Sequence, residues 1–150
     1  MRIRVPVFPL PLLLGLALLP AAAKAQQGAP GGEWPDYGGD LGSTKFAPLS
    51  QIDEANVENV SVAWIWHSPD DELAAENSQL RPAAFKATPL MVDGVLYIRT
   101  SLSLVAAIDA TSGEQLWAFD PLSYEAGRPV NLGFNSRGVA HWNDGDDSRI

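Results

Sequence analysis

The feature that most constrains the fold is the segment Ala107-Ile108-Asp109-Ala110-Thr111-Ser112-Gly113-Glu114-Gln115-Leu116-Trp117. The alternating residues up to Asp109 predict a strand, Thr111-Ser112-Gly113 predicts a tight turn, and Trp117 lies on the returning strand. An indole in this position can lie across a neighbouring sheet and dock against its turn, which removes about 150–250 Å² from water. We therefore expect Trp117 to fasten one small β-sheet to the next.

Further strands are predicted around this turn. The dipeptide Asp93-Gly94 supplies the positive φ angles of a two-residue hairpin turn between two alternating stretches. Together with the opening segment, these stretches predict one four-stranded antiparallel blade over residues 88–119. Its strands are expected at 88–92, 95–100, 102–109 and 115–119, and the next blade is expected to begin at 139–142.

The segments outside the blade are less regular. Residues 50–59 predict one short helix that buries Ile52, Val57 and Val60. Residues 61–66 alternate and predict a strand that carries Val62, Trp64 and Trp66 on one face. Long loops are predicted at 67–84 and 120–133, and no ordinary helix is expected after residue 60.

The predicted fold class is all-β. A β-propeller and a β-sandwich of short strands both fit the strand spacing. A propeller needs at least four blades of roughly 40–50 residues, so a chain of 150 residues holds only part of one. The chain also ends directly after a turn-like stretch, residues 143–148. We therefore expect it to be the N-terminal piece of a longer protein.

Residues 1–25 have the features of a signal peptide. A positively charged start and an uncharged apolar stretch precede a small-residue cleavage site at Ala23-Lys24-Ala25. The alternative is a membrane anchor, but only Leu12–Leu19 is an unbroken apolar run, against the ~20 residues that span a bilayer. We expect cleavage near Ala25, a periplasmic or secreted protein without a transmembrane segment, and a flexible linker at 26–33.

Charge and cysteine content exclude several classes of partner and chemistry. The net charge at pH 7 is −8, and it becomes more negative when the basic leader is removed. A chain with this charge is poorly suited to bind nucleic acid or anionic membranes. Cysteine is absent, which excludes disulfides, thiol nucleophiles and thiolate metal sites.

Several motifs in one order resemble a known family. Residues 34–40 read Trp-Pro-x-Tyr-Gly-Gly-Asp, residues 43–49 read Ser-Thr-Lys-Phe-Ala-Pro-Leu, and residues 88–97 read Thr-Pro-Leu-Met-Val-Asp-Gly-Val-Leu-Tyr. The docking motif follows, with Ser112 in place of the usual Thr, and then Arg137-Gly138-Val139-Ala140. Residues 34–150 thus resemble the quinoprotein dehydrogenases that depend on pyrroloquinoline quinone (PQQ), in particular the glucose dehydrogenase-like branch.

The resemblance implies an eight-bladed β-propeller, of which this chain supplies the N-terminal segment and the first blade. PQQ would lie in the central channel with Ca²⁺ beside it. An alcohol, sugar or polyol would pass a hydride to the quinone, a carboxylate would take the hydroxyl proton, and a cytochrome or membrane quinone would accept the electrons. The catalytic Asp and the calcium ligands are expected beyond residue 150, so the chain alone is expected to be inactive.

Arg137 is the strongest candidate for cofactor binding. In the family, the Arg of this Arg-Gly pair reaches the quinone oxygens and the carboxylate edge of the cofactor. A guanidinium suits that task because it stays charged and offers a fork of donors to anionic oxygens. The alternative is a surface arginine beside a turn made by Gly138.

Lys86 is the second candidate. Many alcohol-oxidising relatives have a Glu here that contacts the cofactor, so this chain departs from the family pattern. Lys86 could pair with a PQQ carboxylate, or it could be a solvated charge at a strand end. The chain also lacks the two adjacent cysteines that some relatives carry before the Arg, because Asn131 and Leu132 occupy those positions.

The remaining polar residues have simpler explanations. His141 could line the channel mouth, but a half-buried strand histidine is the better account, and His67 is expected on a loop surface. The carboxylates at 70–72 and 144–147 are interpreted as solvated turns. Two functions stay open: a PQQ-dependent dehydrogenase, and a non-catalytic propeller scaffold that shares the tryptophan-docking repeats.

Overall fold

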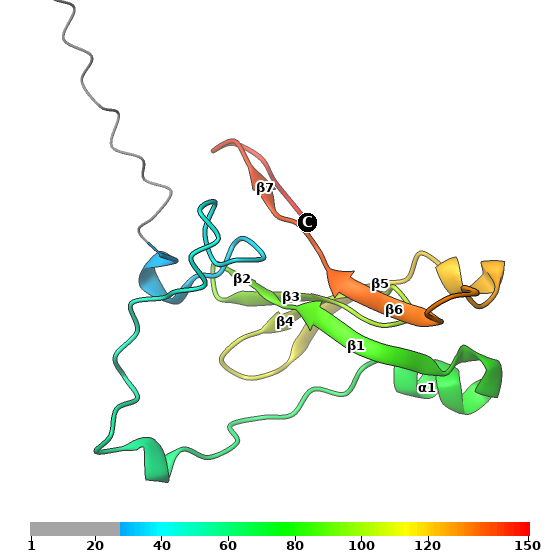
Figure 1. Cartoon of the computed structure of the whole chain (residues 1–150), viewed down its shortest axis with the longest axis horizontal. Coiled ribbons are helices and arrows are strands. Elements are labelled where there is room, and N and C mark those ends of the chain that lie inside the picture. The colour runs from blue at the N-terminus through cyan, green and yellow to red at the C-terminus, as the bar shows by residue number, and fades with distance from the viewer. Residues whose placement is uncertain (1–27) are drawn as a thin grey trace, which may run out of the picture.

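The structure is a computed structural model that describes residues 28–150. The predicted signal peptide, residues 1–25, lies outside the described residues, as do the first two residues of the predicted linker. The described chain forms three small β-sheets joined by irregular segments, with one short α-helix (Figure 1). In chain order the elements are η2 (Pro30–Gly32), η3 (Val57–Asn59), α1 (Asp70–Glu76), η4 (Ser78–Leu80), β1 (Pro82–Thr88), β2 (Leu90–Val92), β3 (Val95–Arg99), β4 (Val105–Asp109), β5 (Gln115–Phe119), η5 (Ser123–Ala126), β6 (Phe134–Gly138), β7 (Trp142–Asn143) and β8 (Ser148–Arg149).

The largest sheet is the predicted blade. Strands β2, β3, β4 and β5 pair in that order, and each pair is antiparallel. The predicted hairpin turn between β2 and β3 is confirmed, because φ is 51° at Asp93 and 78° at Gly94. One face of the sheet buries a small apolar core, against which Trp64, Trp66, Ala87 and Leu96 pack; its buried members are Ile98, Ala106 and Ile108.

The turn between β4 and β5 is held by the side chain of Asp109. Its Oδ1 accepts hydrogen bonds from the backbone N–H groups of Thr111 and Ser112, at 2.9 and 2.7 Å. These bonds lower the pKa of Asp109, the backbone N–H of Ser112 having the largest effect. Gly113 follows with φ of 76°, a conformation that glycine adopts without strain. The turn predicted from Thr111-Ser112-Gly113 is confirmed.

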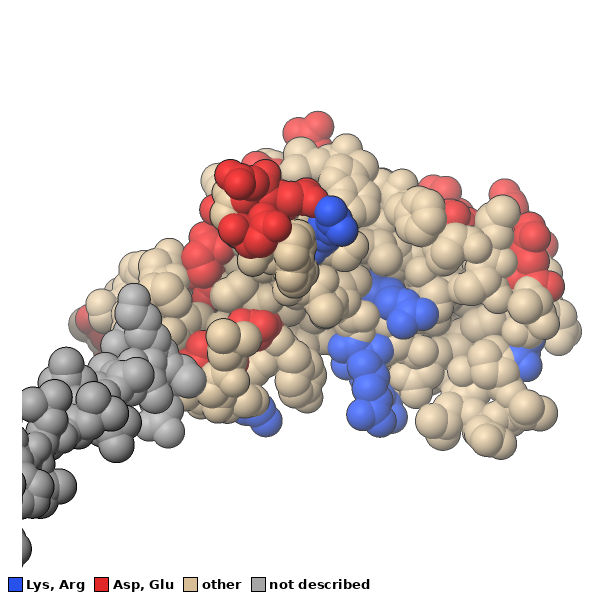
Figure 2. Space-filling view, turned by 90° about the horizontal axis from the view of Figure 1, so that it is seen from above, with Lys and Arg blue, Asp and Glu red and all other residues tan. Residues whose placement is uncertain are grey.

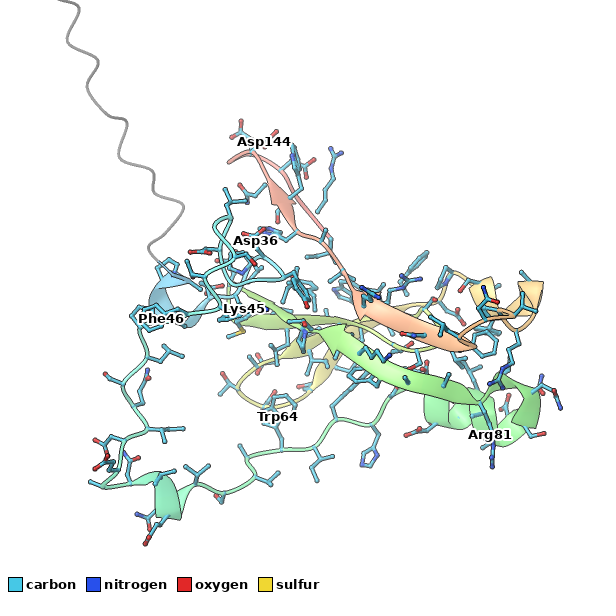
Figure 3. All side chains as sticks on the ribbon, in the orientation of Figure 1. Asp36, Lys45, Phe46, Trp64, Arg81 and Asp144 are labelled. Atoms are coloured by element: carbon cyan, nitrogen blue, oxygen red, sulfur yellow. The ribbon has the colours of Figure 1, made fainter. Side chains whose placement is uncertain are left out.

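A tryptophan does dock on this turn, but it is Trp64. A Cβ added at Gly113 would lie 2.5 Å from the indole ring of Trp64, so the ring lies directly on the glycine. The indole Nε1 donates a hydrogen bond to the carbonyl of Ala110 at 3.1 Å. Figure 3 shows Trp64 reaching from its extended segment toward the β4–β5 turn. The contact joins residues 46 positions apart in the sequence.

The expectation for Trp117 is wrong within the described residues. Trp117 is 44% exposed and docks on no turn; its ring lies 6.0 Å from that of Tyr97 on the same sheet. The reason is its place on β5, which is an edge strand of the β2–β5 sheet. No sheet stands beside that edge in residues 28–150 for the indole to reach.

Residues 50–66 differ from the prediction. Only the short turn η3 forms where a helix was expected, and Ile52 and Val60 are exposed rather than buried. Residues 61–66 run without a strand partner, with Val62 76% exposed. Of the predicted apolar face of 61–66, Trp64 and Trp66 pack against the core of the β2–β5 sheet, whereas the described chain offers no surface that buries Val62.

Besides the short turn η4, the predicted loop at 67–84 contains two elements. The first is α1, which contradicts the predicted loop, but with seven residues it is shorter than a helix of ordinary length. Its first residue, Asp70, is buried, and the Oδ2 atom accepts a hydrogen bond from the backbone N–H of Leu102 at 3.0 Å. The second is β1, whose partner is far away in the sequence and therefore leaves no local turn signal.

Strand β6 is that partner, and it corrects the second predicted blade. Of the strand expected at 139–142, only Trp142 lies in a strand, as the first residue of β7; β6 occupies residues 134–138 and pairs in parallel with β1. A separate hairpin, β7–β8, follows it. A closed propeller ring is not seen in residues 28–150, where the sheets remain small and open (Figure 1). Over the same residues, no helix has the length and apolar character needed to cross a membrane.

Candidate functional site

The parallel pair β1–β6 brings the two predicted cofactor-binding residues together. Phe85 on β1 is in register with Ser136 on β6, and Thr88 is in register with Gly138. Lys86 directly follows Phe85 on β1, and Arg137 directly follows Ser136 on β6. The pairing has a register shift between Phe85 and Thr88, so it is the cavity that both residues line which places Lys86 and Arg137 together.

Lys86 and Arg137 line one open cavity of about 440 Å³, and the third side chain in its lining is that of Tyr37. Both cationic side chains are exposed. Neither has a carboxylate within ion-pair distance, because the ion pair found in residues 28–150 joins Arg149 and Asp147. Among the described residues, the cavity therefore presents two positive charges that no acidic side chain neutralises.

Acidic and basic side chains are unevenly distributed on the molecular surface. In Figure 2 the acidic side chains lie mainly along the upper rim of the face shown, and several basic ones lie nearer its middle and lower edge. Since the whole chain carries a net charge of −8, an unpaired pair of cations is a local exception. Such a cavity is suited to an anionic ligand.

Backbone features hold the two strands close together at this cavity. Gly138 has φ of 123°, and a Cβ there would lie 3.0 Å from the carbonyl oxygen of Thr88. The glycine after Arg137 therefore permits the close approach of β6 to β1. On the β1 side, the hydroxyl of Ser101 donates to the carbonyl of Ala84 at 3.2 Å. These contacts fix the backbone on either side of the two cations.

Tyr37 was missed as a site residue by sequence reasoning. Trp34, Tyr37 and Phe46 predict a packed irregular segment, but Tyr37 is 65% exposed and Phe46 is 57% exposed. The sequence feature that could have indicated Tyr37 is its position between Pro35 and Gly38-Gly39, because proline and glycine favour a tight turn there. Nothing in the sequence alone relates that turn to β1 and β6.

The loop that carries Tyr37 is fastened by Asp40. Its carboxylate accepts hydrogen bonds from the backbone N–H of Thr44 at 2.9 Å and from that of Gly28 at 3.0 Å. The backbone hydrogen bond from Thr44 is the main cause that lowers the pKa of Asp40. Because Gly28 takes part, the described portion of the predicted linker packs against this loop.

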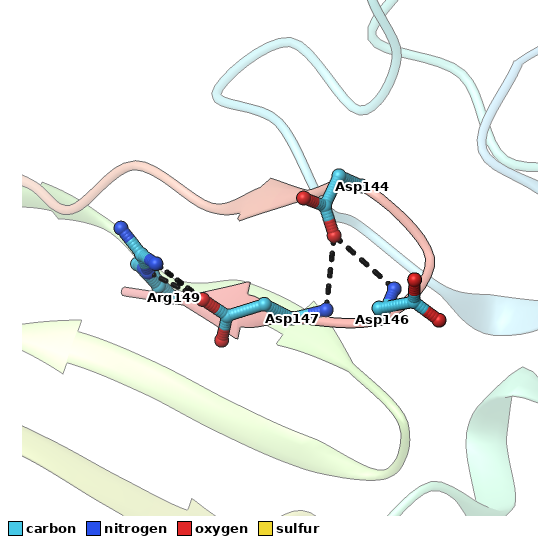
Figure 4. Close-up of polar contacts among 4 residues, drawn as sticks. All are labelled: Asp144, Asp146, Asp147 and Arg149. Carbon is cyan, nitrogen blue, oxygen red and sulfur yellow. Dashed lines mark hydrogen bonds and ion pairs between the residues drawn. The ribbon is translucent and has the colours of Figure 1, made fainter.

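The other polar candidates do not join the cavity. The Nε2 atom of His141 lies 3.0 Å from the Ser148 hydroxyl, and His67 is exposed. In the β7–β8 turn, Asp144 accepts hydrogen bonds from the backbone N–H groups of Asp146 and Asp147, at 3.1 and 2.9 Å, and Asp147 pairs with Arg149 (Figure 4). No group of three potential metal-ligating side chains occurs in the part of the chain that the structure describes.

An apolar cavity of about 460 Å³ lies elsewhere, between the segment around Trp64 and Trp66 and the buried face of the β2–β5 sheet. Its floor includes Leu96, Ile98 and Ile108. It is larger than the cationic cavity, but its lining holds neither Lys86 nor Arg137. The chemistry predicted from the sequence belongs to the cationic cavity.

Comparison with known proteins identifies a family. Residues 34–150 match the PQQ family model described as "Glucose/ethanol/alcohol dehydrogenase, beta-propeller domain". Quinohemoprotein alcohol dehydrogenase ADH IIB of Pseudomonas putida is 38% identical over 125 residues, which are 83% of this chain and 16% of that protein. The 1-butanol dehydrogenase (cytochrome c) of Thauera butanivorans is 35% identical over 85% of this chain and 17% of its own length. The chain thus spans less than a fifth of these relatives.

Solved structures agree with the sequence comparison. The chain superposes on quinohemoprotein alcohol dehydrogenase from Comamonas testosteroni with a TM-score of 0.56 and 32% identity, over 73% of this chain and 15% of that one. For alcohol dehydrogenase ADHIIG from Pseudomonas putida HK5 the TM-score is 0.60, again with 32% identity, over 74% and 15% of the two chains.

The glucose dehydrogenase-like branch is not singled out by these comparisons. Quinoprotein glucose dehydrogenase of Escherichia coli is 33% identical over 89 residues, which are 59% of this chain and 11% of that protein, whereas the alcohol dehydrogenases match longer stretches. The family model that matches residues 34–150 covers glucose, ethanol and alcohol dehydrogenases together. This chain belongs to the PQQ-dependent glucose/ethanol/alcohol dehydrogenase β-propeller family.

Proposed function

We propose that this chain is part of a periplasmic PQQ-dependent dehydrogenase that oxidises an alcohol, sugar or polyol. Among these substrates we favour a simple alcohol, because the relatives that match most of the chain are named as alcohol dehydrogenases. When bound, PQQ supplies the group that accepts the hydride from the substrate. A cytochrome or a membrane quinone would then take the electrons. Export would depend on the predicted signal peptide at residues 1–25.

The observation that carries this proposal is the convergence of Lys86 and Arg137 on one cavity. PQQ is a planar polycarboxylate, so its binding requires positive charge that is not already paired. Arg137 would hold anionic oxygens through its fork of donors, and it would favour the added negative charge of the reduced state. Lys86 would act as a second, more flexible point charge on a carboxylate.

The residues present fit the cofactor as a binding cradle and supply no acid–base chemistry of their own. Neither Lys86 nor Arg137 is suited to take the substrate hydroxyl proton, since both are charged donors at neutral pH. We therefore propose that the catalytic carboxylate and the Ca²⁺ ligands are supplied by residues outside this cavity. The role of this part of the enzyme is to bind and orient the cofactor.

The test uses the full-length protein with PQQ and Ca²⁺. Dye reduction is measured with ethanol, 1-butanol and glucose, and PQQ binding is measured by titration calorimetry. We expect Arg137→Ala to weaken PQQ binding about 10- to 100-fold, which corresponds to the loss of a hydrogen bond to a charged group. Lys86→Ala is expected to weaken it less, by about 5-fold, because a single point charge is lost.

Arg81→Ala is the matched control, because Arg81 precedes β1 and lies near α1 (Figure 3), outside the lining of the cationic cavity. It should leave PQQ binding unchanged. If the wild-type protein neither binds PQQ nor reduces dye with any substrate, the dehydrogenase proposal fails. The non-catalytic propeller scaffold would then be the function to pursue.

A further inference from the structure

We infer that Tyr37 is a third binding residue of the cationic cavity, and that its ring packs against the planar face of the anionic ligand. This inference rests on the proposed function for the identity of the ligand. Tyr37 lies outside β1 and β6, in the irregular N-terminal part of the described chain.

The placement of Tyr37 is fixed by its loop. Gly39 donates a backbone hydrogen bond to the carbonyl of Asp36 at 2.9 Å, and Lys45 donates one to the carbonyl of Gly38 at 2.8 Å. In Figure 3, Asp36, Lys45 and Phe46 all lie close together on this part of the chain. The turn that bears Tyr37 is thus closed on both sides by backbone contacts.

Two glycines make the loop tight enough to hold that position. A Cβ at Gly38 would lie 2.2 Å from the hydroxyl oxygen of Ser43, and a Cβ at Gly39 would lie 3.1 Å from the indole ring of Trp34. Any other residue at 38 would push the two arms of the loop apart. A side chain on such a loop loses little further freedom when a ligand binds, which favours affinity.

Within residues 28–150, the Tyr37 side chain has no aromatic partner and no hydrogen bond. The other two tyrosines both have partners: Tyr97 packs against Trp117, and the hydroxyl of Tyr124 donates to Asp120 at 2.8 Å. Many large apolar side chains of the described residues are exposed, so the 65% exposure of Tyr37 does not by itself single it out. What points to a ligand is that this ring, on a tightly closed loop, lines a cavity together with two cations.

The composition of the cavity indicates which part of the ligand Tyr37 contacts. Lys86 and Arg137 are charged and would pair with carboxylates at the edge of a planar ligand. The flat aromatic surface of that ligand needs an uncharged wall, and Tyr37 is the uncharged side chain of the three. Stacking of two aromatic rings adds stabilisation beyond the apolar area that it buries. The ligand class is therefore a planar aromatic polycarboxylate, of which PQQ is the case tested.

The experiment measures binding of PQQ to the cofactor-free full-length protein in the presence of Ca²⁺, by calorimetry, without a turnover assay. Tyr37→Ala removes the ring, and Tyr37→Phe keeps the ring but removes the hydroxyl. We expect Tyr37→Ala to raise the Kd for PQQ about 10-fold, and Tyr37→Phe to change it less than 3-fold. Tyr124→Phe, at a tyrosine outside this cavity, is the control and should leave the Kd unchanged.

The outcomes separate this inference from the proposed function. If Arg137→Ala and Lys86→Ala weaken PQQ binding but Tyr37→Ala stays within 2-fold of wild type, the Tyr37 inference is wrong and the cofactor proposal stands. If Tyr37→Phe loses as much affinity as Tyr37→Ala, the contact is made by the hydroxyl and the ring-packing inference is overturned. If none of the three alanine variants weakens PQQ binding, the proposed cofactor site itself is wrong. Thermal unfolding of each variant establishes that the fold is retained.

Discussion

The β2–β5 sheet and the β1–β6 pair are built on opposite principles. In the sheet, neighbours in the sequence are neighbours in space, joined by short turns whose residues define them. In the pair, two parallel strands meet although the entire sheet lies between them in the sequence. The sheet holds the apolar core around Ile98, whereas the pair holds the unpaired cations Lys86 and Arg137.

This difference separates stability from ligand binding. Burial of apolar side chains is the main favourable term in folding, and the β2–β5 sheet supplies one of the two small cores, closed by Trp64. The β1–β6 pair instead holds two like charges side by side, an arrangement that disfavours folding slightly and favours an anion. Changes in the sheet should therefore affect unfolding, and changes in the pair should affect binding.

The largest effect is expected from Gly113→Ala in the full-length protein. The new methyl group would meet the Trp64 ring at 2.5 Å, and the residue would hold a φ of 76°. Overpacking and left-handed backbone strain together should lower the free energy of unfolding by about 3 kcal/mol. Gly94→Ala is the matched control, since Gly94 has φ of 78° but nothing within 4 Å of its added Cβ.

Urea unfolding of the two variants measures the difference. Gly94→Ala should lower the free energy of unfolding by about 1 kcal/mol, because it introduces backbone strain alone. Equal losses of unfolding free energy in the two variants would show that Trp64 does not lie on Gly113 in solution. The β2–β5 sheet would then lack the contact that is expected to make it more important for stability than the β1–β6 pair. Neither variant should change the affinity for PQQ at a temperature where the fold is intact.

A smaller effect on stability, with a clear effect on binding, is expected from Gly138→Ala. Its methyl group would lie 3.0 Å from the Thr88 carbonyl, which forces β6 away from β1 beside Arg137. We expect a loss of about 1–2 kcal/mol in unfolding free energy and a weaker affinity for PQQ. Gly127→Ala, with φ of 97° and open space around it, controls for strain. Unchanged PQQ affinity in Gly138→Ala would contradict the binding role of the pair.

The smallest effect is a dependence on pH. Hydrogen bonds lower the pKa of Asp109 in the sheet and of Asp40 in the Tyr37 loop below the usual value of 3.8. A carboxylate with a lowered folded pKa stabilises the fold above its unfolded pKa, and this contribution is lost as pH falls below about 4. Hydrogen exchange measured from pH 5 to 3 should show faster opening of both turns.

Asparagine variants assign that acid sensitivity to each region. Asp109→Asn should remove the pH dependence of hydrogen exchange at the β4–β5 amides and leave that of residues 28–45 unchanged. Asp40→Asn should remove the pH dependence at residues 28–45 and leave that of the β4–β5 amides unchanged. A pH dependence of the β4–β5 amides that persists in Asp109→Asn would show that another group titrates there.

The sequence could predict structure where the determining contacts are local. Asp93-Gly94 and Thr111-Ser112-Gly113 specify their turns through backbone angles and the Asp109 carboxylate, so both turns and the antiparallel order of β2–β5 are confirmed. Strands β1 and β6 were missed because parallel strands are joined by a long crossover connection, so no hairpin turn beside either strand indicates its partner. The α1 helix was missed because its anchor, the bond from Leu102 to Asp70, is also long-range.

Long-range contacts also limited what the sequence could predict about the candidate site. Lys86 and Arg137 were selected by resemblance, one position at a time, and their common cavity became visible only once β1 and β6 were paired. Tyr37 could not be selected, because its neighbours in the sequence predict a tight turn and give no indication of what the turn faces. Apolar residues such as Val62 were misread for a related reason: their pattern predicts burial, but burial requires a surface that residues 28–150 do not supply.

The topology of the β1–β6 pair also sets an order of assembly. Joining these strands encloses the whole β2–β5 sheet in one long loop, and closing such a loop costs entropy that later contacts must offset. We therefore expect the two cations to meet late, after the intervening strands have formed. On that order of assembly, a partly folded chain would lack the double positive centre of the proposed site, and binding of a polyanion would begin only once the first sheet is complete.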